Sequence, residues 1–121
     1  FDLHFALDKV RQKYGFVSGK STHADRLATI KQVYEQDGEL IDPHTADGVK
    51  VARQVRENGE IIVCLETALA AKFEDTIREA VDDVAVPRPA ALAGLENLPQ
   101  RVQTAPNNAE AVKSIIRETL A

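Results

Sequence analysis

The sequence contains one cysteine, Cys64, and neither methionine nor tryptophan. A single cysteine cannot form an internal disulfide, which excludes a disulfide-stabilised secreted scaffold and makes the cytoplasm the expected compartment. Its place inside an apolar run is typical of an inert buried thiol rather than a nucleophile. No apolar run is long enough to span a membrane, and no secretory or transit segment is recognisable, so we expect no membrane partner.

Positive charge and aromatic residues are also in short supply. The chain has 15 Lys and Arg against 19 Asp and Glu, a net charge of -4, and only 5% aromatic residues. No basic cluster with interleaved aromatics occurs, so we expect no nucleic-acid partner. The three histidines, His4, His23 and His44, match no metal-ligand spacing and have no cysteine pair beside them, so no metal site is expected. The 121 residues correspond to one domain or part of one.

The strongest pattern that is present is an apolar run at residues 61–65 (IIVCL), which follows an Asn-Gly break. A short, mostly β-branched run predicts a strand buried on both faces, as in a parallel sheet. Polarity returns directly afterwards, and a helical pattern begins near Ala70. Thr67 is therefore expected at the carboxyl end of a buried strand, where ligands bind in open α/β sheets. The alternative is that Thr67 caps the next helix.

A helix is predicted from Thr22 to about Asp37. Thr22 and Asp25 form a capping-box-like pair at its start, and Gly38 is placed to end it. The free N–H groups at this start, with Lys20 nearby, could hold an anion, although a solvated cap is the simpler interpretation.

A second helix is predicted from Asp42, which suits an N-cap, with Pro43 in its first turn. His44 lies in the same turn, where its imidazole could exchange a hydrogen bond with a ligand, and a purely structural role is the alternative. Gly48 inside the helix costs about 1 kcal/mol relative to alanine, which favours a close packing contact or the approach of a ligand there.

The remaining patterns complete an alternation of strands and helices. Strands or extended segments are expected at residues 1–7, 40–41 and 101–105, and helices from about Ala70 to residues 86–89 and after Asn107. This order predicts an α/β fold, part of a doubly wound sheet with right-handed crossovers and helices on both faces. So few strands make a thin sheet, so we expect it to continue into strands supplied by sequence outside this chain.

Two motifs together resemble threonine synthase, in its bacterial and fungal branch. They are residues 41–46 (IDPHTA) followed by Gly48, and residues 66–73 (ETALAAKF), and their order and spacing also match that family. Residues 18–26 and 98–101 resemble the family less sharply.

The resemblance covers most of the chain from about Gly15 and corresponds only to the carboxyl-terminal part of such an enzyme. Residues 1–121 are therefore expected to be that carboxyl-terminal portion, with the upstream catalytic portion missing. One departure is Ala70, where the family usually has proline. It changes the rigidity of the turn after Thr67 and removes no reactive group.

The resemblance implies a pyridoxal-phosphate enzyme of the tryptophan-synthase-like fold (fold type II), which converts O-phospho-L-homoserine and water to L-threonine and phosphate. It assigns Thr67 as the hydroxyl residue that faces the pyridine nitrogen of the cofactor. A hydroxyl can hydrogen-bond a ring nitrogen without carrying charge, so it tunes the cofactor less strongly than a carboxylate would. The resemblance places His44 only in the vicinity of the substrate, without a defined role.

The resemblance also implies two groups that this sequence lacks: the lysine that holds the cofactor as an imine, in a Ser-Phe-Lys-Asp type motif, and the glycine-rich loop that binds its phosphate. We therefore expect no catalytic residue in this chain and no activity from it alone. It would supply one wall of the site and pack against the amino-terminal part of its own polypeptide. The alternative is a free-standing small α/β module that holds an anion at its helix N-termini.

Overall fold

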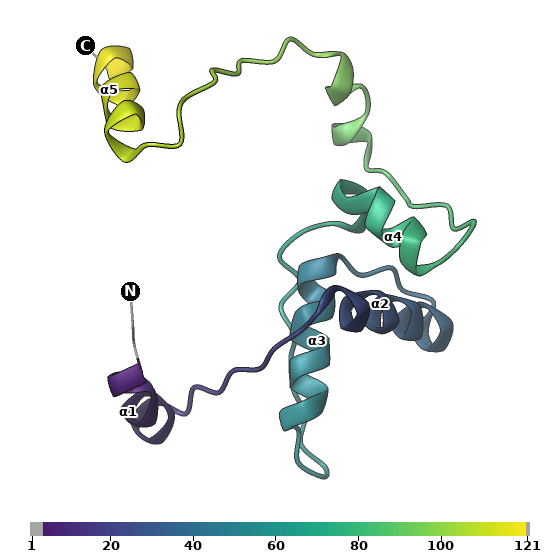
Figure 1. Cartoon of the computed structure of the whole chain (residues 1–121). Helices are drawn as coiled ribbons and strands as arrows, with labels where there is room; N and C mark the ends of the chain where they lie inside the picture. The colour runs from purple at the N-terminus through teal and green to yellow at the C-terminus, as the bar shows by residue number, and fades with distance from the viewer. Residues whose placement is uncertain (1–3, 121) are drawn as a thin grey trace. The chain divides into compact units, whose positions relative to one another are not determined.

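The computed structural model describes residues 4–120, and all its regular elements over this range are helices (Figure 1). Two compact units are present, one reaching to Ala90 and one from Ala91 onward. The α-helices are α1 (His4–Tyr14), α2 (His23–Asp37), α3 (Pro43–Val55), α4 (Glu74–Ala80) and α5 (Ala109–Leu120). Short 3₁₀ helices are η1 (Ala70–Phe73), η2 (Ala90–Leu92) and η3 (Leu95–Asn97).

Helix α2 begins and ends as predicted. The Thr22 hydroxyl accepts a hydrogen bond from the Asp25 backbone N–H at 3.2 Å, and the Asp25 carboxylate accepts one from the Thr22 backbone N–H at 2.8 Å. This is a complete capping box. At the other end, Gly38 adopts a left-handed conformation (φ 75°), and its N–H donates to the Tyr34 carbonyl at 3.0 Å.

Helix α3 also begins as predicted, with Asp42 as its N-cap and Pro43 as its first residue. The Asp42 carboxylate accepts a hydrogen bond from the His44 backbone N–H at 2.9 Å. Proline suits the first helical position because the N–H that it lacks has no partner within the helix there.

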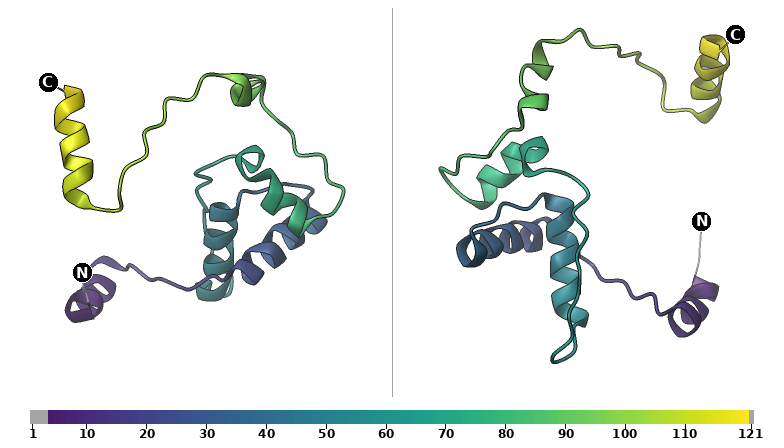
Figure 2. Two further views of the ribbon diagram at one scale, coloured as in Figure 1. Left: turned by 45° about the horizontal axis from the view of Figure 1, so that its top comes forward. Right: turned by 180° about the vertical axis from the view of Figure 1, so that it is seen from behind.

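The core of the larger unit lies between α2, α3, η1 and α4, which gather side by side in Figures 1 and 2. Ile30 of α2 and Ile77 of α4 are fully buried, and each contributes about 1.5–3 kcal/mol by leaving water. Small side chains at Ala46, Ala70 and Ala80 complete the buried cluster and allow the elements to approach closely.

Charged groups fix α3 against α2. The Arg26 guanidinium donates two hydrogen bonds to the Asp47 carboxylate, from Nε at 3.1 Å and from Nη2 at 2.7 Å. Lys50 Nζ lies 3.8 Å from the Asp25 carboxylate. The paired geometry of Arg26 and Asp47 is the arrangement in which arginine binds a carboxylate most specifically.

The predicted strands are not found among the described residues, where no strand occurs. Residues 61–65, 40–41 and 101–105 have no regular secondary structure, and residues 4–7 belong to α1. The rest of the 1–7 prediction lies outside the described residues. A strand exists only through backbone hydrogen bonds to a neighbouring strand, and residues 61–65 have no such bond within the described part of the chain. This chain therefore does not form the doubly wound sheet by itself.

Two helix boundaries also differ from the prediction. The helix expected from Ala70 begins as the 3₁₀ turn η1, and α4 ends at Ala80, well before the prolines at residues 86–89. The cap of α5 is Asn108 rather than Asn107. The Asn108 side-chain oxygen accepts from the backbone N–H groups of Glu110 at 2.8 Å and Ala111 at 3.3 Å.

Two glycines provide a matched test of this fold. We expect Gly38→Ala to lower the free energy of unfolding by about 1 kcal/mol, because its left-handed backbone is unfavourable for a residue with a Cβ. Gly48→Ala should be neutral or should raise it by up to about 1 kcal/mol. Its backbone is helical, and the new Cβ would lie 3.7 Å from Cys64 Sγ, an ordinary contact. Urea unfolding of both variants checks this, and destabilisation by Gly48→Ala would contradict it.

Candidate functional site

Thr67 is exposed and follows the apolar segment at residues 61–65 directly after Glu66. It does not cap a helix: the N-cap of η1 is Leu69, which makes no side-chain cap hydrogen bond. Its hydroxyl has no hydrogen bond to any of the described residues. The helix-cap interpretation is therefore wrong, and the hydroxyl is available to a group outside the described part of the chain.

The segment that follows Thr67 is anchored at two points. Ala70 is buried in the core, and the Lys72 backbone N–H donates to the Leu69 carbonyl at 3.0 Å. The Phe73 ring packs edge-on against the His44 ring, with centroids 5.0 Å apart and planes inclined by 64°. The structure thus joins the two motifs that the sequence singled out, through Phe73 rather than through Thr67 itself.

His44 has an exposed side chain (61%) and one fixed ring nitrogen. Its Nδ1 lies 3.0 Å from Asp42 Oδ1. Because an ionised carboxylate can only accept hydrogen bonds, we assign the ring proton to Nδ1. Nε2 is then the ring atom left facing away from Asp42, and the ring is held both by this bond and by the Phe73 edge.

Asp42 has more contacts than the N-cap role predicted from the sequence requires. It is fully buried, and its carboxylate accepts from the His44 backbone, the His44 ring and the Thr45 hydroxyl. Burial alone would raise the pKa of Asp42, but the bonds from Thr45 and His44 outweigh it and hold the pKa below its ordinary value. The sequence signal was the spacing of the donors, two and three residues after an aspartate that precedes proline.

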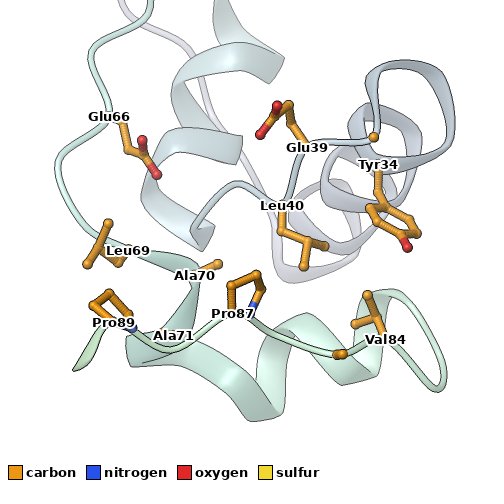
Figure 3. A pocket seen from close by; sticks show the side chains of 12 residues that line it. Tyr34, Glu39, Leu40, Glu66, Leu69, Ala70, Ala71, Val84, Pro87 and Pro89 are labelled. Carbon is orange, nitrogen blue, oxygen red and sulfur yellow. The ribbon is translucent and has the colours of Figure 1, made fainter. Parts of the chain in front are cut away.

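A hollow of about 380 Å³ borders the same segment (Figure 3). It lies between the end of α2, Leu40, η1 and the chain after α4, with Val84 and Pro87 on one wall. Thr67 does not line it, but the preceding Glu66 does, as does Glu39. The hollow is therefore adjacent to the segment that carries Thr67 and does not itself contain that hydroxyl.

The anion site considered at the start of α2 is not supported by the arrangement found. The capping box occupies the first N–H groups, and Lys50 bonds the Lys20 carbonyl and lies near Asp25. His23 pairs with Glu79 at 3.0 Å. Lys50 and His23 are thus engaged with groups of the chain.

Over residues 4–120, no three side chains of His, Cys, Asp or Glu converge as a metal site would require. Within the same range no helix has the length and apolar character needed to cross a membrane.

Known proteins similar to this chain are threonine synthases. The threonine synthase of Corynebacterium glutamicum is 51% identical over 116 residues, which cover 94% of this chain and 24% of that protein. The threonine synthase of Methylobacillus glycogenes is 52% identical over 105 residues, covering 87% and 22% respectively. The crystal structure of pyridoxal-phosphate-bound threonine synthase from Brucella melitensis matches with a TM-score of 0.69 and 35% identity, over 93% of this chain and 24% of that one.

A family model described as the carboxyl-terminal region of threonine synthase matches residues 45–116. The chain belongs to this family. The match includes Thr67 and Phe73 and begins one residue after His44. The chain spans about a quarter of the length of these two curated relatives.

The buried carboxylates predict how stability depends on pH. The pKa of Asp47 is also lowered: burial would raise it, and the Arg26 hydrogen bonds more than offset that. Near pH 4 the unfolded chain therefore binds more protons than the folded one at Asp42 and Asp47. Their stabilisation is complete above about pH 4 and is lost as the pH falls through the folded-state values.

We expect the free energy of unfolding to fall as the pH decreases below about 4. Asp47→Asn should reduce the size of this fall, because one of the carboxylates with a lowered pKa is gone. Urea unfolding at a series of pH values measures it. A stability that is flat across this range in the parent chain would show that these carboxylates are not held as described.

Proposed function

We propose that this chain is the carboxyl-terminal part of a pyridoxal-phosphate-dependent threonine synthase, which converts O-phospho-L-homoserine and water to L-threonine and phosphate. The observation that carries the proposal is the free hydroxyl of Thr67, inside the family match and without a partner among the described residues. The likeness to a pyridoxal-phosphate-bound structure supports it. The family match favours this reading over the alternative, a free-standing anion-binding module.

The residues present are compatible with this cofactor. When bound, pyridoxal phosphate supplies an electron sink for chemistry at the substrate's carbon atoms. Thr67 would donate its hydroxyl proton to the pyridine nitrogen, which fixes the ring without placing a charge beside it. In this proposal, the lysine that holds the cofactor and the loop that binds its phosphate belong to the rest of the polypeptide. No catalytic residue is assigned to this chain.

The exposure of residues 61–65 alternates, which supports their role as a strand in the complete protein. Ile62 is 38% exposed and lines a hollow against α3 together with Cys64. Ile61, Val63 and Leu65 are 89%, 78% and 80% exposed. Alternation with period two places these two sets on opposite faces of an extended segment.

We therefore propose that the rest of the polypeptide pairs with residues 61–65 and covers the outward face formed by Ile61, Val63 and Leu65. A buried parallel strand with helices on both faces has just this composition. The relatives contain about three times as much additional chain as is present here, which is ample to supply that sheet. The single cysteine agrees with the cytoplasm as the proposed compartment.

The proposed function has a direct test. The complete polypeptide that carries this chain should release phosphate and form threonine from O-phospho-L-homoserine when pyridoxal phosphate is present. The 121-residue chain alone should do neither and should bind the cofactor weakly or not at all, because it lacks the cofactor lysine and a phosphate-binding loop. A cofactor absorbance band in the isolated chain, fixed to one of its lysines by borohydride, would contradict this.

The assignment of Thr67 predicts different results for two substitutions. In the complete protein, Thr67→Ser keeps the hydroxyl and should remain active. Thr67→Val keeps the shape but loses a hydrogen bond that is worth about 0.5–1.5 kcal/mol in typical cases, and more where charge develops during the reaction. We expect the valine variant to turn over more slowly and to shift the cofactor's absorbance spectrum, with an unchanged melting temperature. If it matches the parent in rate and spectrum, the assignment fails.

His44 is proposed to order the wall of the site near the substrate without transferring protons. His44→Asn retains an N–H group close to the position of Nδ1, which can still donate to Asp42. With pyridoxal phosphate at saturation, the complete protein with this change should keep most of its turnover, because loss of the ring contact with Phe73 affects cofactor binding and not proton transfer. A loss of about a hundredfold or more, the range for a general acid or base, would show that the imidazole takes part in proton transfer.

A further inference from the structure

Two successive contacts lead from the start of α3 to the segment that carries Thr67. The buried Asp42 carboxylate binds His44 Nδ1 at 3.0 Å, and the His44 ring packs 5.0 Å from the Phe73 ring. Phe73 ends η1, three residues after the buried Ala70. No other described side chain makes a ring contact with either His44 or Phe73.

We propose that Asp42 is a positioning residue for Thr67, acting through the His44 ring and the edge of Phe73. This inference rests on the proposed function, in which Thr67 meets the cofactor. The Thr67 side chain has no anchor of its own among the described residues, so its position depends on the backbone that follows it. That backbone is tied to the core at Ala70, in the cluster that also contains Ala46 of α3, and its ring contact with α3 is the one between Phe73 and His44.

The competing explanation is that Asp42 is only a helix cap. A cap needs one acceptor for the first backbone N–H groups, and serine provides it nearly as well as aspartate. The bond to the His44 ring goes beyond that requirement. It also orients an imidazole that would otherwise rotate about its side-chain bonds, since most of its surface is exposed. A group that acts only as a cap would not need this second bond.

The test uses three variants of the complete protein, first without cofactor. Asp42→Ser keeps a helix cap, but its shorter side chain cannot reach His44 Nδ1. Asp42→Asn keeps an acceptor oxygen in place. His23→Asn serves as the matched control, because it alters an exposed histidine–carboxylate pair elsewhere in the same unit. Amide hydrogen exchange, followed by peptide mass, should become faster at residues 68–73 in Asp42→Ser. The amides of α3 should stay protected. The other two variants should match the parent.

Cofactor binding gives a second, independent measurement. Asp42→Ser should bind pyridoxal phosphate about two- to tenfold more weakly, the range for loss of one positioning hydrogen bond. Phe73→Leu should have a similar effect. If both act along one chain of contacts, the double variant should be hardly weaker than either single one, because the changes are not independent.

Each outcome has a defined meaning. If Asp42→Ser leaves exchange at residues 68–73 and cofactor affinity unchanged, or if the effects of the two single changes multiply, the positioning role is refuted. If Asp42→Ser fails to fold, the Phe73→Leu variant provides the test. Unchanged amide hydrogen exchange at residues 68–73 in that variant refutes the proposal. If the parent protein neither binds the cofactor nor forms threonine, the proposed function has failed, whereas the exchange result stands apart from it.

Discussion

The carboxylate of Asp42 lies entirely out of contact with solvent, and it can remain ionised there only because donors surround it. The His44 backbone, the His44 ring and the Thr45 hydroxyl supply them. All three come from the first turn of α3, so forming that turn and burying the carboxylate are one event. Loss of any donor would leave part of a buried charge without a partner, at a typical cost of about 1–3 kcal/mol or more.

This turn also relates the helices to the candidate site. The Arg26–Asp47 pair fixes α3 against α2. The His44 ring packs against Phe73, which connects α3 to the segment after Thr67. The site is therefore built from the ends of elements rather than from their middles. The Thr67 hydroxyl has no partner among the described residues. In the proposed function, the rest of the polypeptide supplies the opposite side of the cavity that this hydroxyl faces.

The helix ends could be predicted from the sequence because their chemistry is local. Thr22 with Asp25, and Asp42 with Pro43, satisfy the first N–H groups whatever the rest of the chain does. Residues 61–65 could not be predicted in the same way. Their composition indicates a strand, but a strand needs a neighbour, and the described residues provide none. The run was expected to be buried on both faces, whereas all five residues are exposed among the described residues, with Ile62 at 38% and Ile61 at 89%.

The site, too, could be predicted only in part from the sequence. The exposed position of Thr67 after an apolar run follows from the abrupt change of polarity in the sequence. The contact between His44 and Phe73 does not, because it joins residues about thirty positions apart through tertiary packing. The burial of Asp42 could not be predicted either, because an aspartate before proline is as typical of an exposed helix cap as of a buried one.

The central claim is that residues 61–65 complete a sheet with the remainder of a threonine synthase polypeptide. Amide hydrogen exchange at these residues, compared between the 121-residue chain and the complete protein, tests it most directly. The account predicts rapid exchange in the isolated chain, where these amides have no backbone partner, and strong protection in the complete protein. Equally rapid exchange in both would contradict it.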